Sequence, residues 1–185
     1  MTKKIKILLV ISILLNAFLL YQFIHNKRNL ESAELFGQVY FYNSISNLNN
    51  NFKSIATTLE LYGEPLTEKE LQLFNQATER ERINILDTRS NLAAAMTFTN
   101  MNFSIYYEKY LLNIAKLLGE IVEGQSFHKS DINALIASLN SANQSINDLF
   151  SQGKGNEGIS SELTVKKIYG DLERVNKQVE LVYSK

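Results

Sequence analysis

Apolar side chains recur at steps of three and four residues through most of the chain. This spacing places them on one face of an α-helix and is typical of helices that pack side by side, as in coiled coils. Because the steps are not of two, helix is also favoured over strand for the valine-rich end of the chain. The clearest seams are Phe41, Ile45, Leu48, Phe52, Ile55, Leu59 and Tyr62; Ile132, Leu135, Leu139, Ala142, Ile146 and Leu149; and Val165, Ile168, Leu172, Val175, Val179 and Val182.

Turn residues divide the chain between these seams. Breaks fall at residues 63–65, 124–126 and 153–158, which hold most of the glycines and the single proline. Thr67 and Glu70 have the spacing of a capping box, which begins a new helix. We therefore predict helices over residues 31–62, 67–123, 130–152 and 160–184.

Two predicted helices contain stretches of low helix propensity. Asparagines crowd residues 47–51, but the seam continues through them, so we predict helix there. Residues 97–102 are Thr, Asn, Phe and Met, and a kink or break there is the alternative to one helix over 67–123. We favour the single helix, which would be about 85 Å long. Its first half would pair with helix 31–62 and its second half with the last two helices.

The N-terminal apolar run has a different pattern. Residues 7–24 carry no charge and show no polar face, and about 18 such residues are near the minimum for a helix that crosses a bilayer. Residues 1–6 hold three lysines, and Lys27 and Arg28 follow the run. The sequence predicts a single-pass signal-anchor: a cytoplasmic tail over 1–6, a transmembrane helix over 7–24, and an extracytoplasmic domain over 29–185.

A cleaved signal peptide is the main alternative for this run. Such a peptide has the same basic start and apolar middle, but its cleavage site needs small residues. Here the run ends in Tyr-Gln-Phe-Ile-His-Asn-Lys-Arg, which is bulky and charged. A buried core helix of a soluble domain fits the run less well, because such a helix normally has a polar face and residues 7–24 show none. We expect an uncleaved anchor in the cell membrane.

Charge is unevenly distributed, although the chain has 19 bases and 19 acids. Five bases flank the apolar run and no acid precedes Glu31, which leaves 14 bases against 19 acids in the remainder. A mildly acidic domain lacks the basic face of a nucleic-acid-binding protein, so we expect no nucleic acid partner. The many Asn, Lys and Ile residues are typical of a low-GC bacterium.

Candidate chemistry is sparse. The chain has no cysteine, and its two histidines, His25 and His128, lie far apart with no carboxylate at helical ligand spacing. Residues 153–155 read Gly-Lys-Gly but lack the spacing of a phosphate-binding loop. We therefore predict no catalytic residue, no metal and no cofactor, and do not expect an enzyme.

Aromatic clusters are the remaining feature. Tyr40 and Tyr42 flank Phe41, while Tyr106 and Tyr107 are adjacent. Consecutive residues point to different sides of a helix, so some of these rings leave the core. Exposed tyrosines are common at recognition surfaces, which makes Tyr40, Tyr42, Tyr106 and Tyr107 candidate partner-binding residues. The alternative is that they fill a wide core.

The predicted fold is all-α: one transmembrane helix, then an elongated antiparallel bundle of three to four long helices with coiled-coil-like packing. The predicted function is a membrane-anchored extracytoplasmic interaction module that binds or stabilises another membrane or envelope protein. The alternative is a helical bundle that senses a small ligand and acts through a separate membrane partner.

Overall fold

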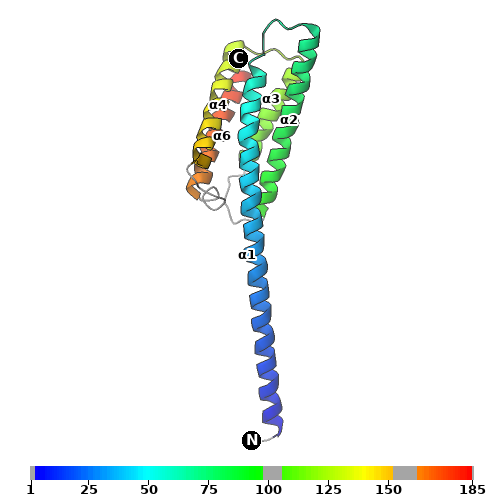
Figure 1. Cartoon of the computed structure of the whole chain (residues 1–185), viewed down its shortest axis with the longest axis vertical. Helices are drawn as coiled ribbons and strands as arrows, with labels where there is room; N and C mark the ends of the chain where they lie inside the picture. Colours follow the sequence, from blue (N-terminus) through cyan, green and yellow to red (C-terminus); the bar gives the residue numbers. More distant parts are fainter. Residues whose placement is uncertain (1–2, 98–105, 152–161, 185) are drawn as a thin grey trace. The chain divides into compact units, whose positions relative to one another are not determined.

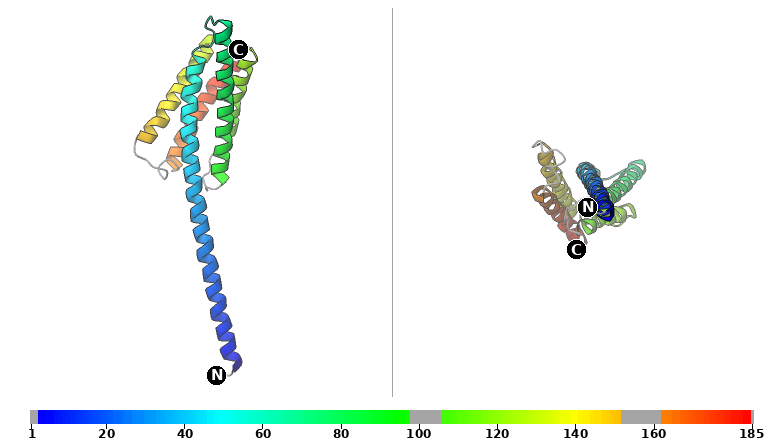
Figure 2. Two further views of the ribbon diagram at one scale, coloured as in Figure 1. Left: turned by 45° about the vertical axis from the view of Figure 1, so that its right-hand side comes forward. Right: turned by 90° about the horizontal axis from the view of Figure 1, so that it is seen from below.

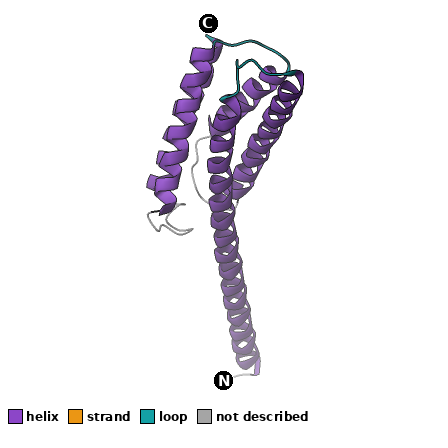
Figure 3. Ribbon diagram, turned by 45° about the horizontal axis from the view of Figure 1, so that its top comes forward, coloured by secondary structure: helices purple, strands orange, loops and turns teal. Residues whose placement is uncertain are grey.

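The computed structural model describes residues 3–97, 106–151 and 162–184, and for residues 3–14, 17, 97, 106 and 162 it describes the backbone alone. The described residues form helices joined by short loops, with no strand among them (Figure 3). The all-α prediction is therefore confirmed. The helices are α1 (Lys3–Leu59), α2 (Glu68–Thr97), α3 (Tyr106–Val122), α4 (Lys129–Ser151) and α6 (Glu162–Tyr183).

The chain divides into two compact units, Met1–Phe36 and Gly37–Lys185, and α1 contributes residues to both. In the first unit, the large apolar side chains that are described are 45–70% exposed. Within residues 3–97, 106–151 and 162–184, none of the helices has the length and apolar character needed to cross a membrane. In the predicted transmembrane helix, residues 7–24, half of the side chains (7–14 and 17) lie outside the described set.

The second unit is a bundle of five described helical segments. α2 packs on α3, α3 on α6, and α6 on α4. Hydrogen bonds from Asn49 and Asn51 link α1 to α4 and α2. α4 and α6 lie on one side of residues 37–59 of α1, and α2 and α3 lie on the other (Figures 1 and 2).

The prediction of one continuous helix over 67–123 is wrong. Arg89 of α2 forms an ion pair of 3.0 Å with Glu108 of α3. The Arg82 Cδ lies 3.3 Å from the point where a Cβ on Gly119 would stand, whereas one helix would hold these residues about 55 Å apart. Packing of α3 on α2 and α6 buries the apolar face of α3. The alternative break over residues 97–102 falls almost wholly on residues 98–102, which lie outside the described residues.

The predicted seams form the core. The side chains of Phe41, Ile45, Leu48, Phe52, Ile55 and Leu59 are 0–1% exposed, and the seams of α4 and α6 are buried with them. α2 supplies fewer apolar residues, and its inward positions include Thr78, Glu81 and Thr88. The bundle core is thus mostly apolar, and its buried polar side chains lie on α1, α2 and α6.

The asparagine-rich part of α1 is helical, as predicted, and its side chains join three helices. Asn49 donates to the Asn147 Oδ1 at 2.7 Å and accepts from the Asn143 Nδ2 at 2.7 Å, both on α4. Asn51 donates to the Thr88 Oγ1 at 2.9 Å and to the Asn84 carbonyl at 3.1 Å, both on α2. Buried amides with these partners fix the register of α1 against its neighbours.

Candidate functional site

One end of the bundle is closed by two loops and the C-terminal end of α6. Residues 60–67 join α1 to α2, and residues 123–128 join α3 to α4 (Figure 1). Each loop turns at a glycine with a positive φ, Gly63 at 74° and Gly124 at 86°, which side chains with a Cβ rarely adopt. We call this region the capped end.

A capping box starts α2 at this end, as the sequence predicts. The Thr67 amide donates to the Glu70 Oε2 at 2.8 Å, and the Glu70 amide donates to the Thr67 Oγ1 at 3.4 Å. The hydrogen bond from the Thr67 side chain lowers the pKa of Glu70. These bonds satisfy backbone donors at the helix start and so define the direction in which α2 leaves the loop.

Three aromatic side chains tie the loops together. The Phe127 amide donates to the Tyr62 hydroxyl at 2.6 Å, and that hydroxyl donates to the Phe127 carbonyl at 3.3 Å. The Phe127 ring meets the Tyr183 ring edge-on at 5.8 Å, and the Lys116 Nζ lies 5.0 Å from the centre of the Tyr183 ring. Residues distant in sequence therefore hold the capped end in one arrangement.

An apolar pocket opens beneath the α1–α2 loop. Its volume is about 400 Å³, and its lining includes Leu61, Leu66, Phe74 and Ile121. A shallow groove of about 650 Å³ continues from it along α2, and the two share Leu71, Asn75 and Val122. We call the pocket the end pocket and its continuation the α2 groove.

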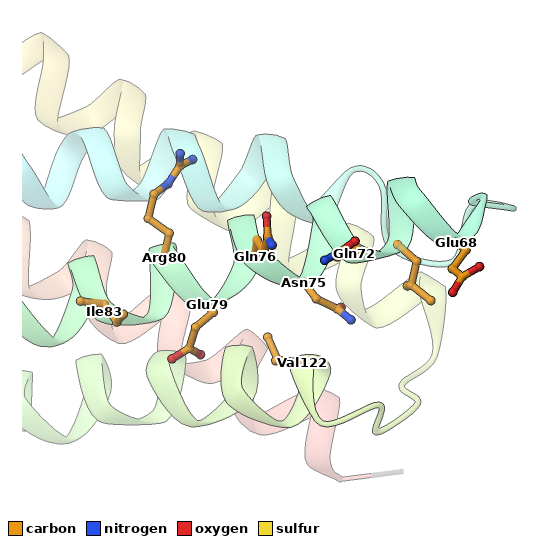
Figure 4. A pocket seen from close by; sticks show the side chains of 9 residues that line it. Glu68, Gln72, Asn75, Gln76, Glu79, Arg80, Ile83 and Val122 are labelled. Atoms are coloured by element: carbon orange, nitrogen blue, oxygen red, sulfur yellow. The ribbon is translucent and has the colours of Figure 1, made fainter.

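The α2 groove and the end pocket are lined in part by half-exposed apolar side chains. Leu61 is 47% exposed, Leu71 49% and Ile83 48%. Figure 4 shows Asn75 and Glu79 on the side of α2 that faces Val122 of α3, and Arg80 on the side away from α3. Half-exposed apolar side chains beside a formed pocket are typical of a binding surface.

Two of the charged side chains that line this groove, Glu79 and Arg80, form ion pairs. Arg82 makes two hydrogen bonds to the Glu79 carboxylate, at 2.6 and 2.5 Å, and these lower the pKa of Glu79. Arg80 donates to the buried carboxylate of Glu81 at 3.0 Å. The bases beside the groove are therefore already engaged with acids of α2.

Of the four predicted partner-binding tyrosines, the structure describes the side chains of Tyr40, Tyr42 and Tyr107, and these differ in exposure. Tyr40 is 39% exposed, whereas Tyr42 is half-buried with its ring edge-on to Phe150 at 5.1 Å. The Tyr106 side chain lies outside the described set. Tyr107 is 1% exposed, and burial raises the pKa of its hydroxyl to about 12. Tyr107 fills the core, which corrects its assignment as a partner-binding residue, because a buried ring presents no area to a partner.

The residues of the α2 groove were not among the predicted site residues. Part of their signal is in the sequence, since Ile83 falls outside the helical phase of the buried residues Phe74, Ile85 and Leu92, whereas Leu71 is in phase with them and is exposed in the first turn of α2. Apolar residues out of phase with a core seam indicate a second apolar surface. The end pocket itself depends on two loops, and no local pattern identifies it.

Neither a metal-binding cluster nor a similar protein identifies a function for this chain. In the part of the chain that the structure describes, no three His, Cys, Asp or Glu side chains gather in a way that could hold a metal ion. Comparisons with protein-family models, with curated proteins and with solved structures each find no match for this chain. The proposals below therefore rest on the chain's own residues.

Proposed function

We propose that this chain is a membrane-anchored helical module that binds a partner protein of the cell envelope through the α2 groove. The observation that carries the proposal is the exposure of Leu61, Leu71 and Ile83 beside a formed pocket. Removing such side chains from water on binding stabilises a complex by about 25 cal/mol per Å² of apolar area. The aromatic contacts of the capped end support the proposal, because a preformed surface loses little entropy on binding.

The anchor in this proposal is residues 7–24, with the N-terminus in the cytoplasm and the bundle outside. The uncharged run and its flanking bases support it. Exposure supports it as well: Leu15, Phe18, Phe23 and the apolar residues between them that the structure describes are 55–67% exposed. Apolar side chains exposed around a helix are stable in hydrocarbon and unfavourable in water.

Small-ligand sensing is the second candidate, and the end pocket is the observation that favours it. A volume of about 400 Å³ lies within the range typical of small-molecule sites, which combine an apolar lining with a few polar groups. Here Asn75, Gln125 and Ser126 supply polar groups beside Phe74 and Ile121. A ligand in this pocket would raise the melting temperature of the chain, whereas a partner protein would be found by cross-linking.

Photo-cross-linking in intact native cells tests the interaction module. A photoreactive amino acid is placed singly at Leu71 and at Ile83, with Leu163 of α6, 75% exposed, as the matched control. We expect the same envelope protein in adducts from Leu71 and Ile83, and no such adduct from Leu163. Adducts of equal yield from all three positions, or from none, would contradict the proposal.

Reporter fusions test the anchor and its orientation. A reporter active only in the cytoplasm, joined after residue 185, should stay silent on the full chain and become active when residues 1–28 are removed. Reporter activity on the full chain would overturn the proposed orientation. The fragment 29–185 should itself be soluble, with a circular dichroism spectrum dominated by helix.

A further inference from the structure

Two tyrosines meet between α3 and α6. The hydroxyls of Tyr110 and Tyr169 form a hydrogen bond of 3.0 Å, and the ring centres lie 5.7 Å apart with the rings tilted by 36°. Both side chains are half-buried and pack on the bundle core. In each ring the ortho carbons adjoin the carbon that carries the hydroxyl. The contact between the hydroxyls therefore also brings ortho carbons of the two rings close together.

A second contact holds the same pair of helices. The Asn113 Nδ2 on α3 donates to the Asn176 Oδ1 on α6 at 2.8 Å, and the Asn176 Nδ2 donates to the Glu180 Oε1 at 2.8 Å. These bonds and the direct packing of α3 on α6 keep the two tyrosine rings beside each other. Groups that are held in contact react far faster than the same groups in free solution, because the encounter has already taken place.

Two other tyrosines have neighbours of a different kind. The ring of Tyr42 meets that of Phe150 edge-on at 5.1 Å, and the ring of Tyr183 meets that of Phe127 edge-on at 5.8 Å. Phenylalanine has no hydroxyl, so its ring is much harder to oxidise to a radical. The contact between α3 and α6 differs in placing two oxidisable rings side by side.

The chain has no cysteine, so no disulfide can join its helices. We propose that Tyr110 and Tyr169 form a dityrosine site, at which a peroxide couples the two rings through their ortho carbons and links α3 covalently to α6. The proposal is independent of the partner protein and of the α2 groove, because neither tyrosine lines that groove.

The coupling is a two-electron oxidation. Each phenol loses one electron and one proton, and the two phenoxyl radicals then join by a bond between one ortho carbon of each ring. Each of these carbons releases its hydrogen as a proton, each oxygen takes up one proton, and both rings become aromatic again. The peroxide takes up the two electrons and its O–O bond breaks. With hydrogen peroxide, the two protons released overall complete two water molecules.

The surroundings of the pair suit this reaction. The hydrogen bond with the Tyr169 side chain raises the pKa of Tyr110, so this phenol is protonated near neutral pH and has to lose its proton with its electron. Because both rings are half-buried, water reaches the site and can accept that proton. The resulting link joins residues 59 positions apart, which restricts the unfolded chain and should raise the melting temperature.

Oxidation of the full chain in detergent micelles tests the proposal. The oxidant is persulfate, a peroxide, activated by light and a ruthenium tris-bipyridine sensitiser, and the monomer is then isolated by denaturing electrophoresis. Trypsin cleaves after Lys and Arg, and it releases residues 110–116 and 168–174 as peptides that each contain one tyrosine. We expect these two peptides joined, with the mass of their sum less two hydrogen atoms and with the fluorescence of dityrosine.

Single-atom variants assign the link to this pair. Tyr110→Phe and Tyr169→Phe should each abolish the joined peptide, while Tyr21→Phe, at a position that is 64% exposed, should leave its yield unchanged. Oxidation of the chain in urea is the control for geometry, because unfolding separates the rings and should remove most of the yield. The oxidised wild-type monomer should melt at a higher temperature than the untreated chain, and the two oxidised Phe variants should show no such rise.

Each result bears on the proposal. The joined peptide from the folded chain, lost in both Phe variants and in urea, supports it. Absence of the joined peptide, equal yields from folded and unfolded chain, or dityrosine formed only by other tyrosines would overturn it. An unchanged melting temperature of the linked monomer would overturn the stabilising role of the link. None of these results depends on whether cross-linking from Leu71 captures an envelope protein.

Discussion

Two stretches of α1 differ in whether they bury or expose a phenylalanine side chain. Phe41 of α1 is fully buried, whereas Phe23 of α1 is 67% exposed. Both rings lie in regular helix. The difference comes from spacing: residues 41–59 concentrate their apolar groups on one face, while residues 7–24 have no polar face. A one-sided helix is covered by other helices, whereas a helix apolar all round has to be covered on every side.

The largest expected contrast is between Phe41→Ala and Phe23→Ala. Truncation of a fully buried phenylalanine removes apolar contacts and leaves a cavity, so Phe41→Ala should lower the free energy of unfolding by about 3–5 kcal/mol. Phe23→Ala should change it by less than about 0.5 kcal/mol. Urea unfolding of the full chain in detergent micelles, followed by circular dichroism, measures both. Equal losses would mean that Phe23 packs on the bundle.

Two asparagines of α1, one buried and one exposed, allow a second comparison of the two stretches. Asn49 is 6% exposed and bonded to Asn143 and Asn147, whereas Asn26 is exposed. Asn49→Ala should cost about 1–3 kcal/mol, because two hydrogen bonds from a buried side chain to α4 are lost, and Asn26→Ala should cost close to nothing. The same urea titration applies. If Asn49→Leu proved more stable than wild type, the amides would serve register and not stability.

A tyrosine pair gives a smaller contrast. Tyr62→Phe removes the hydroxyl that bonds both backbone groups of Phe127, and should lower the free energy of unfolding by about 1 kcal/mol. Tyr21 is 64% exposed, so Tyr21→Phe should have no measurable effect. Thermal melting of the full chain compares the two variants. An unchanged melting temperature for Tyr62→Phe would remove the argument that this bond holds the capped end together.

The smallest effect near neutral pH comes from Tyr107. Burial raises the pKa of its hydroxyl to about 12, from an ordinary value of 10. Between pH 10 and pH 12 the unfolded chain releases this proton while the folded chain keeps it, so the free energy of unfolding falls as the pH rises. Tyr107→Phe should make that fall less steep. An identical slope for the variant would show that this hydroxyl does not contribute.

Local pattern accounts for much of the fold. The seams of α1, α4 and α6 follow from side-chain spacing, and the start of α2 follows from the Thr67 and Glu70 side chains. Helix formation and capping depend on residues within a few positions of each other. The uncharged run at residues 7–24 is likewise a property of the sequence alone.

Only the tertiary structure decided the turn between α2 and α3, the burial of Tyr107 and the position of the end pocket. Each depends on which helices become neighbours, and that depends on the sum of contacts between residues far apart in the chain. The contact of Arg82 with Gly119 and the bonds between Tyr62 and Phe127 are examples. The spacing of apolar residues shows which face of a helix is apolar. Burial of that face also requires a second helix that packs on it, and the local sequence does not identify that helix.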